Sequence, residues 1–448
     1  MVRRILFPLL LLQLALPALA LASTTYYVDC SAGNDSNPGT SVSAAWSTVT
    51  KVNSVAYSPG DTILFKKGCT WTDAYLYTTS SGLAGSPITF GAYGSGAQPI
   101  FSGQTYGLYV HSSYVTIDGL HFSHATTMGI IAGNANITGV VVENSTVDYS
   151  TKSGIFLYGN APGSYTVGNF TFLHNIVANN GTTTDDQGIY IDNSNNNILD
   201  GNTWDSNAGY GVQIQDSSDN NTVRYNYFHN NGFAGSWGGA LTIYNNQTSV
   251  YHLPTGNQIY GNVSNGDRYG LLVGGTTATV NNTVVNNTFY GNQYGLIIQS
   301  GITFGTFKNN IVWSTNTAYP LDVTGSVSSD YNIVGPAHSG FIQWNGSSYD
   351  SLGTYSSATG NDAHSKASDP LFVNSSSANF TLQSTSPAID AGVNAGTAYQ
   401  MELDPTSTFP WTTLNENSYG KGWDIGAFIF TGTGTAPNPP TGLIGTVN

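Results

Sequence analysis

The sequence has very few charged residues. Lys and Arg number 11 and Asp and Glu number 25 among 448 residues, so only 8% of the chain is charged and the formal net charge is −14. Soluble proteins usually carry about 25% charged residues. The shortage excludes a highly charged disordered chain. The lack of a basic patch excludes a typical nucleic-acid-binding protein.

Residues that build exposed helix faces are also scarce. The chain has three Met and few Lys or Glu, whereas exposed helical surfaces usually consist of Glu, Lys and Ala. Aromatic residues, by contrast, make up 12% of the chain, and there are 53 Gly and 45 Asn. A solvated linker does not carry so many aromatic residues. The composition therefore favours a β-rich protein whose surface is polar without being ionic.

Long apolar runs are missing except at the N-terminus. Residues 1–22 begin with Arg3 and Arg4, continue with an apolar core and end in a small-residue pattern at Ala20 and Ala22. This pattern is typical of a cleaved signal peptide, and the apolar core is too short for a membrane span. We therefore expect no membrane span in the mature chain. We expect a secreted protein, extracellular or periplasmic, that is a monomer with a mature charge of −16.

Cysteine is limited to two residues, Cys30 and Cys69. In an exported protein such a pair predicts one disulfide. The alternative is two unrelated buried thiols, and the spacing suits no metal site.

What the sequence does contain is a repeat. Asn residues follow short β-branched runs at intervals of 22 to 36 residues, and a second series of short apolar segments lies about ten residues after them. The Asn positions are Asn144, Asn175, Asn202, Asn226, Asn262, Asn287, Asn310 and Asn332. The later segments begin at Gly154, Gly188, Gly211, Ala240, Gly270 and Gly295. Two short strands in each unit, repeated many times, predict a solenoid.

The strand period decides which solenoid is expected. Apolar residues alternate with period two, as in Ile189 and Ile191 or Val212 and Ile214, which indicates strands and not helices. Stacked coils would align these side chains into buried columns. Asn would recur at one bend, where it tolerates left-handed backbone angles and can bond its copy in the next coil. The low charge has the same origin, because like charges stacked at strand spacing repel one another.

The repeats resemble those of secreted right-handed parallel β-helix proteins, the superfamily of pectate lyases, polygalacturonases and alginate lyases. The segments that carry the resemblance are YYVDCSAGNDSNPGTS (26–41), PGDTILFKKG (59–68), VTIDGLHF (115–122), SDPLFV (368–373), SPAIDAG (386–392) and WDIGAF (423–428). The resemblance implies an all-β fold, a right-handed parallel β-helix.

The domain boundaries follow from this resemblance. A single domain would span 23–430, with an N-terminal cap and first coils at 23–105, regular coils at 106–345 and an irregular closing region at 346–430. Residues 431–448 form a tail rich in Gly, Thr and Pro, which is a linker composition.

In the related proteins, substrate binds along the outside of one sheet. Many of the outward positions here are aromatic or amide residues, which suit a sugar chain because rings pack on sugar faces while amides bond hydroxyls. The predicted substrate-binding residues are Tyr158, Tyr190, Gln213, Gln215, Trp237 and Tyr244. The alternative is an ordinary polar sheet surface. The expected partner is a polysaccharide.

The few charged residues suggest where catalysis would occur. Lys152, Asp186 and Arg268 recur two residues before the later segments, with Asp185 beside Asp186. For a lyase acting on a uronate-containing glycan, a basic residue removes the proton. The predicted catalytic residues are Lys152, Asp186, Arg224 and Arg268. Calcium is a possible cofactor, and its predicted ligands are Asp185, Asp186 and Asp192.

Two other functions remain open. A glycoside hydrolase would use a pair of Asp residues, which here would be Asp185 or Asp186 together with Asp192 or Asp148. A non-catalytic glycan-binding protein would need no such pair. In the family of calcium-dependent pectate lyases that the chain resembles, a Lys stands where this sequence has Gln213. The negative mature charge would also repel an anionic polymer. We expect polysaccharide degradation, with elimination slightly favoured over hydrolysis.

Overall fold

The computed structural model describes residues 23–159, 165–235, 237–246, 250–314 and 319–432. The predicted signal peptide at 1–22 and nearly all of the predicted tail lie outside the described residues. Within the described ranges, no helix has the length and apolar character needed to cross a membrane.

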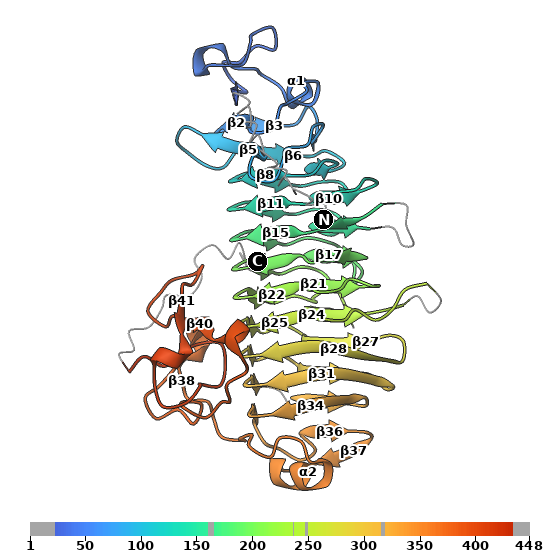
Figure 1. Cartoon of the computed structure of the whole chain (residues 1–448), viewed down its shortest axis with the longest axis vertical. Coiled ribbons are helices and arrows are strands. Elements are labelled where there is room, and N and C mark those ends of the chain that lie inside the picture. The colour runs from blue at the N-terminus through green and yellow to red at the C-terminus, as the bar shows by residue number, and fades with distance from the viewer. Residues whose placement is uncertain (1–22, 160–164, 236, 247–249, 315–318, 433–448) are drawn as a thin grey trace, which may run out of the picture.

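The chain forms a right-handed parallel β-helix, so the fold prediction is confirmed (Figure 1). Each regular coil contributes one strand to each of three sheets. Within these three sheets, as far as the chain is described, the strand pairs are parallel except the last pair of the second sheet, β36 with β37.

Sheet 1 consists of β1 (Thr25–Val28), β2 (Thr62–Lys66), β5 (Ile88–Tyr93), β8 (Val115–Asp118), β11 (Val140–Glu143), β15 (Phe170–Leu173), β19 (Ile198–Asp200), β22 (Thr222–Arg224), β25 (Gln258–Tyr260), β28 (Ala278–Val285), β31 (Ile302–Lys308) and β34 (Ser326–Asp330). Sheet 2 consists of β4 (Leu76–Tyr77), β7 (Leu108–Val110), β10 (Ile130–Gly133), β13 (Ile155–Tyr158), β17 (Ile189–Asp192), β21 (Tyr210–Gln215), β24 (Gly239–Tyr244), β27 (Tyr269–Gly274), β30 (Tyr294–Ile298), β33 (Leu321–Val323), β36 (Ile342–Trp344) and β37 (Ser347–Tyr349).

Sheet 3 consists of β3 (Thr70–Trp71), β6 (Ile100–Ser102), β9 (His121–Ser123), β12 (Thr146–Asp148), β16 (Ile176–Ala178), β20 (Thr203–Asp205), β23 (Tyr227–His229), β26 (Val263–Asn265), β29 (Thr288–Tyr290), β32 (Ile311–Trp313) and β35 (Ile333–Gly335). The remaining strands form two-stranded pairs: β14 (Val167–Gly168) with β18 (Ser194–Asn195), β38 (Phe372–Asn374) with β39 (Asn379–Leu382), and β40 (Met401–Leu403) with β41 (Thr413–Asn415). The helices are α1 (Val49–Asn53) and α2 (Leu352–Thr359), with single 3₁₀ turns at Val42–Ala44, Ser375–Ser377, Thr397–Tyr399 and Glu416–Ser418.

The interior of the β-helix is filled by the alternating apolar residues. Ile155, Ile189, Val212 and Leu241 lie in register on neighbouring strands of sheet 2, and all are buried in one continuous core. No single coil could bury these side chains alone, so the stack of coils provides the core.

Three ladders of polar residues run through the interior, one at each bend between sheets. The sequence predicted a ladder at only one bend. Their members are Asn175, Asn202, Asn226, Asn262, Asn287, Asn310 and Asn332; then Asn180, Asn207, Asn231, Asp267 and Asn292; and finally Asn197, Asn221, Asn257 and Asn282. At each step the backbone N–H of one member donates to the side-chain oxygen of its copy in the next coil. At most steps the side-chain amide donates there too, as in the 3.0 Å bond from Asn202 Nδ2 to Asn226 Oδ1.

The predicted left-handed position is one residue away from the first ladder. His174, Tyr225 and Asn286 have φ near +55°, and each precedes a buried ladder Asn. Asn144 itself has φ of 50° and lies at this left-handed position. The prediction that Asn144 belongs to the ladder was therefore wrong. The next residue, Ser145, stands at the ladder position, where its backbone N–H donates a hydrogen bond to Asn175 Oδ1.

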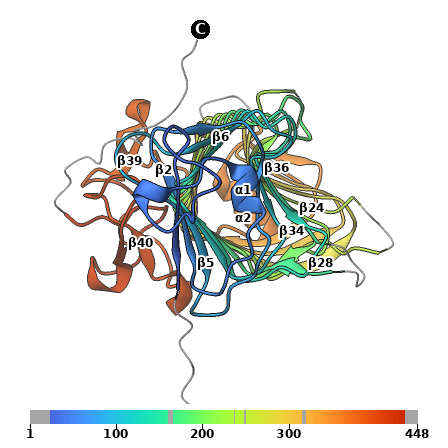
Figure 2. The ribbon, with the colours of Figure 1, turned by 90° about the horizontal axis from the view of Figure 1, so that it is seen from above.

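The two ends of the β-helix are closed differently. At the N-terminal end lie α1 and a disulfide between Cys30 and Cys69. At the other end lies α2, after which residues 366–432 fold back along the outside of the β-helix (Figures 1 and 2). This closing segment packs Phe428 and Trp411 against Tyr227 and Val263, so it covers the side of sheet 3 and does not continue the stack.

The closing segment also buries carboxyl groups. Glu402 and Glu416 are fully buried there. Burial raises the pKa of Glu416 to about 8 and the pKa of Glu402 well above its usual range. Burial therefore favours the protonated form of both carboxyl groups.

Candidate active-site groove

Outward side chains of sheet 2 form two columns across its strands. Tyr190 of β17 lies opposite Gln213 of β21, which lies opposite Thr242 of β24. Two residues further along the same strands, Asp192, Gln215 and Tyr244 form the second column. The strand period of two sends the apolar residues between them into the core.

A groove of about 400 Å³ lies over these strands. Its lining consists of Thr184, Asp185, Gln187, Tyr190, Tyr210, Gln213, Gln215, Trp237, Thr242, Tyr244, Asn246 and Leu272. Five of the six residues predicted to bind substrate lie in this lining, and Tyr158 lies beside it on β13. The lining of this groove, as far as the chain is described, contains one carboxylate and no Lys or Arg.

Tyr210 is a lining residue that the sequence analysis missed. It belongs to a row of outward tyrosines, because its ring stacks on Tyr269 at 6.5 Å and Tyr269 lies 5.3 Å from Tyr294. Each of these tyrosines directly precedes a Gly at the start of a strand. The repeated Tyr-Gly pair is the sequence signal that would have identified them.

Two carboxyl groups lie at the rim of the groove where the strands end. Asp192 is the last residue of β17, and Asp216 follows the end of β21 on the next coil. Burial, with the nearby Asp216 carboxylate, raises the pKa of Asp192 to about 7. Asp216 accepts hydrogen bonds from Gln215 Nε2 at 3.2 Å and from Asn246 N at 3.3 Å. Burial raises the pKa of Asp216 as well, although these two donors favour its ionised form. None of the described residues donates a hydrogen bond to the carboxylate of Asp192.

Lys152 and Asp186 lie at the opposite end of the strands. Lys152 Nζ is 3.6 Å from Asp186 Oδ1, and the Lys side chain is 49% exposed. The other oxygen of Asp186 accepts hydrogen bonds from Thr182 N, Thr183 N and Thr183 Oγ1 at 2.8 to 3.0 Å. Asp186 therefore shapes the loop that carries Asp185 to the groove.

The three predicted calcium ligands do not converge. Asp185 and Asp186 precede β17, whereas Asp192 ends it, and six residues of extended chain span about 20 Å. One oxygen of Asp186 is already occupied by its loop. Calcium requires several oxygen ligands at 2.3–2.6 Å from one point, so these three carboxylates do not fit one shared ion.

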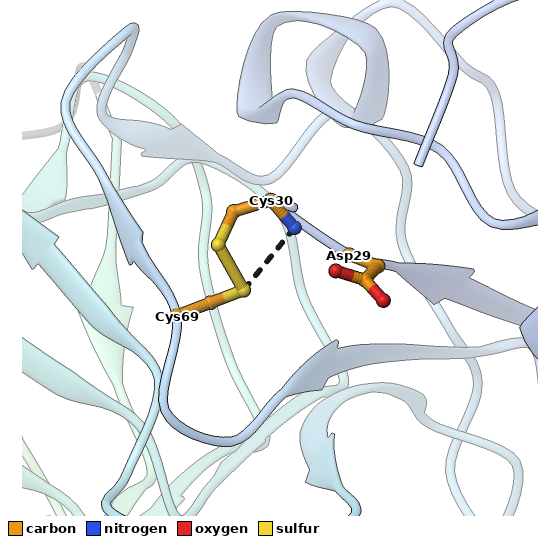
Figure 3. A group of neighbouring side chains, drawn as sticks. All are labelled: Asp29, Cys30 and Cys69. Carbon is orange, nitrogen blue, oxygen red and sulfur yellow. Dashed lines mark hydrogen bonds between the residues drawn. A yellow bond between two sulfur atoms is a disulfide. The ribbon is translucent and has the colours of Figure 1, made fainter. Parts of the chain in front are cut away.

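Among the described residues, one group of three potential ligands lies within 4.8 Å, and it consists of Asp29, Cys30 and Cys69. Figure 3 shows that both sulfurs belong to the disulfide, and that Cys30 N donates a 3.2 Å hydrogen bond to Cys69 Sγ. The thiolate form needed for metal binding is therefore absent. The Asp29 carboxylate instead pairs with Lys66 at 2.7 Å.

The structure separates the two predicted arginines from the Lys152 group. Arg224 lies on β22 of sheet 1, where its guanidinium contacts Asp200 at 2.8 Å and Tyr260 at 3.1 Å. Arg268 lies before β27, donates to Gly235 O at 3.1 Å and lies over the ring of Tyr269. Sequence spacing did not show that Arg224 lies on sheet 1, or that Arg268 lies four strands along sheet 2 from Lys152.

Comparisons with known proteins agree with this architecture. Residues 106–289 match the family model described as the right handed beta helix region. Pectate lyase Pel9A is similar in structure, with a TM-score of 0.63 and 20% identity over 92% of this chain and 97% of that one. XylC in complex with xylose has a TM-score of 0.50 and 10% identity over 78% of this chain and 87% of that one. These structural likenesses show the fold, a right-handed parallel β-helix.

A curated relative matches a short part of the chain. The lacto-N-biosidase of Bifidobacterium longum subsp. longum is 45% identical over 76 residues. The match covers 16% of this chain and 5% of that enzyme, so this chain spans only a small part of its relative's length.

Proposed function

We propose that this protein is secreted and that it binds and cleaves a polysaccharide in the groove of sheet 2. The observation that carries the proposal is the groove lining, in which Tyr190, Trp237 and Tyr244 surround Gln213 and Gln215. Aromatic rings pack on the apolar faces of sugars, and amides bond their hydroxyl groups. The names of the relatives, a pectate lyase, a lacto-N-biosidase and a xylose-bound protein, support a carbohydrate substrate.

Hydrolysis is the chemistry that the groove supports best. A glycoside hydrolase needs one protonated and one ionised carboxyl group, and neighbouring carboxyls in different environments supply both states. Asp192, with a pKa raised to about 7 by burial, donates a proton to the glycosidic oxygen as the bond to the sugar carbon breaks. Asp216, whose carboxylate accepts two hydrogen bonds, is the second carboxylate, and water supplies the hydroxyl group of the product.

Elimination is the second candidate function. Lys152 lies at the other rim of the sheet and is half exposed, so it can approach a substrate. Its ammonium group faces Asp186 at 3.6 Å, and a paired ammonium is a poor proton acceptor. The mature protein is negatively charged and would repel a negatively charged uronate polymer, which also weighs against elimination.

A panel of neutral and uronate-containing polysaccharides, incubated with residues 23–448, separates these functions. Hydrolysis produces new reducing ends without ultraviolet absorbance of unsaturated sugars, and it is lost in Asp192→Asn but kept in Lys152→Ala. We expect this result, with kcat/KM falling as pH rises above about 7 because Asp192 loses its proton.

The opposite results would each reject part of the proposal. Unsaturated products that require Lys152 and are lost in EDTA would establish elimination instead. Retention on a polysaccharide gel without any product would leave a glycan-binding protein.

A further inference from the structure

Aromatic side chains on the outer face of sheet 2 continue beyond the groove, towards the N-terminal end. We call them the tyrosine track. Its members are Tyr75, Tyr77, Tyr106, Tyr109, Phe156, Tyr158 and Tyr165. All of them are half-buried, so each ring keeps part of its surface open to solvent.

The track and the groove share one column of the sheet. Tyr77 lies opposite Tyr109, which is followed in the column by Ile131, Phe156 and Tyr190 of the groove. The rings of Phe156 and Tyr190 are stacked at 5.0 Å, and those of Tyr77 and Tyr109 lie 5.5 Å apart. From β4 to β17 there are four strand spacings, or about 19 Å, which leaves room for several sugar rings.

Hydrogen bonds hold two of these rings in place. Asn134 Nδ2 donates to Tyr109 Oη at 2.9 Å, and Tyr165 Oη donates to Asn134 Oδ1 at 3.2 Å. The Tyr165 ring in turn lies 6.1 Å from Tyr158. Binding to rings that are already fixed costs less conformational entropy than binding to mobile ones.

Aromatic residues on another side of the β-helix have a structural partner. Tyr225 donates its hydroxyl to Met401 O at 3.0 Å, and the Tyr227 ring lies 6.1 Å from Trp411. Both partners belong to the closing segment. The track rings pack mainly on one another, and their outer surfaces lie on the face that already carries the groove.

We propose that the tyrosine track binds a further stretch of the polysaccharide that enters the groove, and that this polymer consists of uncharged sugar rings. The inference rests on the proposed function, because the groove supplies the point at which the chain continues. The track consists of aromatic side chains without Lys or Arg, so it offers stacking surfaces and hydroxyls but no cation for a uronate. A long chain bound on both sides of the cleaved bond is cut internally.

The test compares a double variant, Tyr77→Ala with Tyr109→Ala, with a matched control, Tyr419→Ala, on the closing segment. Affinity gels containing glucomannan, xylan, hydroxyethyl cellulose or polygalacturonate measure binding, and product sizes measure cleavage. We expect wild type to be retarded by a neutral polymer and not by polygalacturonate, and the double variant to bind about tenfold more weakly. Cleavage of a trisaccharide should change less than twofold, and the control should match wild type.

Circular dichroism and thermal unfolding show whether the double variant is folded. If the double variant is unfolded, Tyr109→Phe, which keeps the aromatic ring, takes its place. Tyr109→Phe should bind nearly as wild type. Unchanged binding and cleavage of polymers by the folded double variant would overturn the track while the proposed function stands. Track-dependent binding without any products would reject cleavage but support the track. Binding to polygalacturonate alone, or to none of the polymers, would overturn the inference.

Discussion

The ladders inside the β-helix and the groove on its surface are both rows of neutral polar side chains, but they use their hydrogen-bonding groups differently. Asn226 in the first ladder accepts from Asn202 and donates to Asn262 and Leu199 O. In the groove, Gln213 and Gln215 belong to one strand and bond each other along it, and the partly exposed Gln213 lines the groove. The same chemistry therefore stabilises the stack where it is buried and offers binding groups where it faces outwards.

The largest expected effect is on catalysis in the groove. Asp192→Asn removes the proposed acid, so we expect kcat to fall about 10³-fold. Asp322→Asn is the matched control, because Asp322 lies in an outward column of sheet 2 on β33, and burial also raises its pKa. The measurement is the release of reducing ends under saturating substrate. Equal losses in the two variants would show that Asp192 acts only through the fold.

The second effect is on stability and concerns a ladder. Asn226→Ala removes the side-chain oxygen that accepts hydrogen bonds from two buried donors, the backbone N–H of Asn202 and Nε1 of Trp204. We expect the free energy of unfolding to fall by about 3 kcal/mol, as measured in urea by circular dichroism. Asn374→Ala, at an exposed position, should change it by less than about 0.5 kcal/mol. A ladder variant as stable as this control would mean that the ladder adds no net stability.

The sequence predicted the fold and named half of the residues that line the groove, because both depend on local alternation. The period of two distinguishes inward from outward residues, and this places Gln213 and Tyr244 on the outside. It does not identify which of three sheets a strand joins, and so Arg224 was grouped with Lys152 although it lies on sheet 1.

Position along a strand was the other source of error. Asp185 and Asp192 are close in sequence, but an extended strand separates them. Asp216 was missed because its effect on Asp192 depends on contact between coils. Contact between coils can be predicted only when the register of the paired strands is known.

The third prediction tests the one carboxylate in a ladder. Asp267 takes the place of an Asn in the second ladder, and burial raises its pKa to about 6. The folded protein therefore binds more protons than the unfolded chain between about pH 4 and 6, and stability falls as pH rises through this window.

Asp267→Asn converts this position to the chemistry of its neighbours. At pH 8 we expect the free energy of unfolding to rise by about 2 kcal/mol, and at pH 4 to change little. Urea unfolding at both pH values measures the difference. Destabilisation at both would show that the bond from Ser264 Oγ to Asp267 Oδ2, 2.7 Å long, outweighs the cost of the buried charge.

The smallest expected effect is on substrate binding, and it distinguishes an outward amide side chain from a buried ladder amide. Gln213→Ala removes a proposed contact to sugar hydroxyls without opening the core, so we expect KM to rise about fivefold, or about 1 kcal/mol, with kcat and stability unchanged. Gln343→Ala on β36 is the matched control, because it belongs to the same outward column beyond the groove. If kcat falls instead of KM rising, Gln213 acts in the transition state, and the comparison then places it with Asp192 and not with the binding residues.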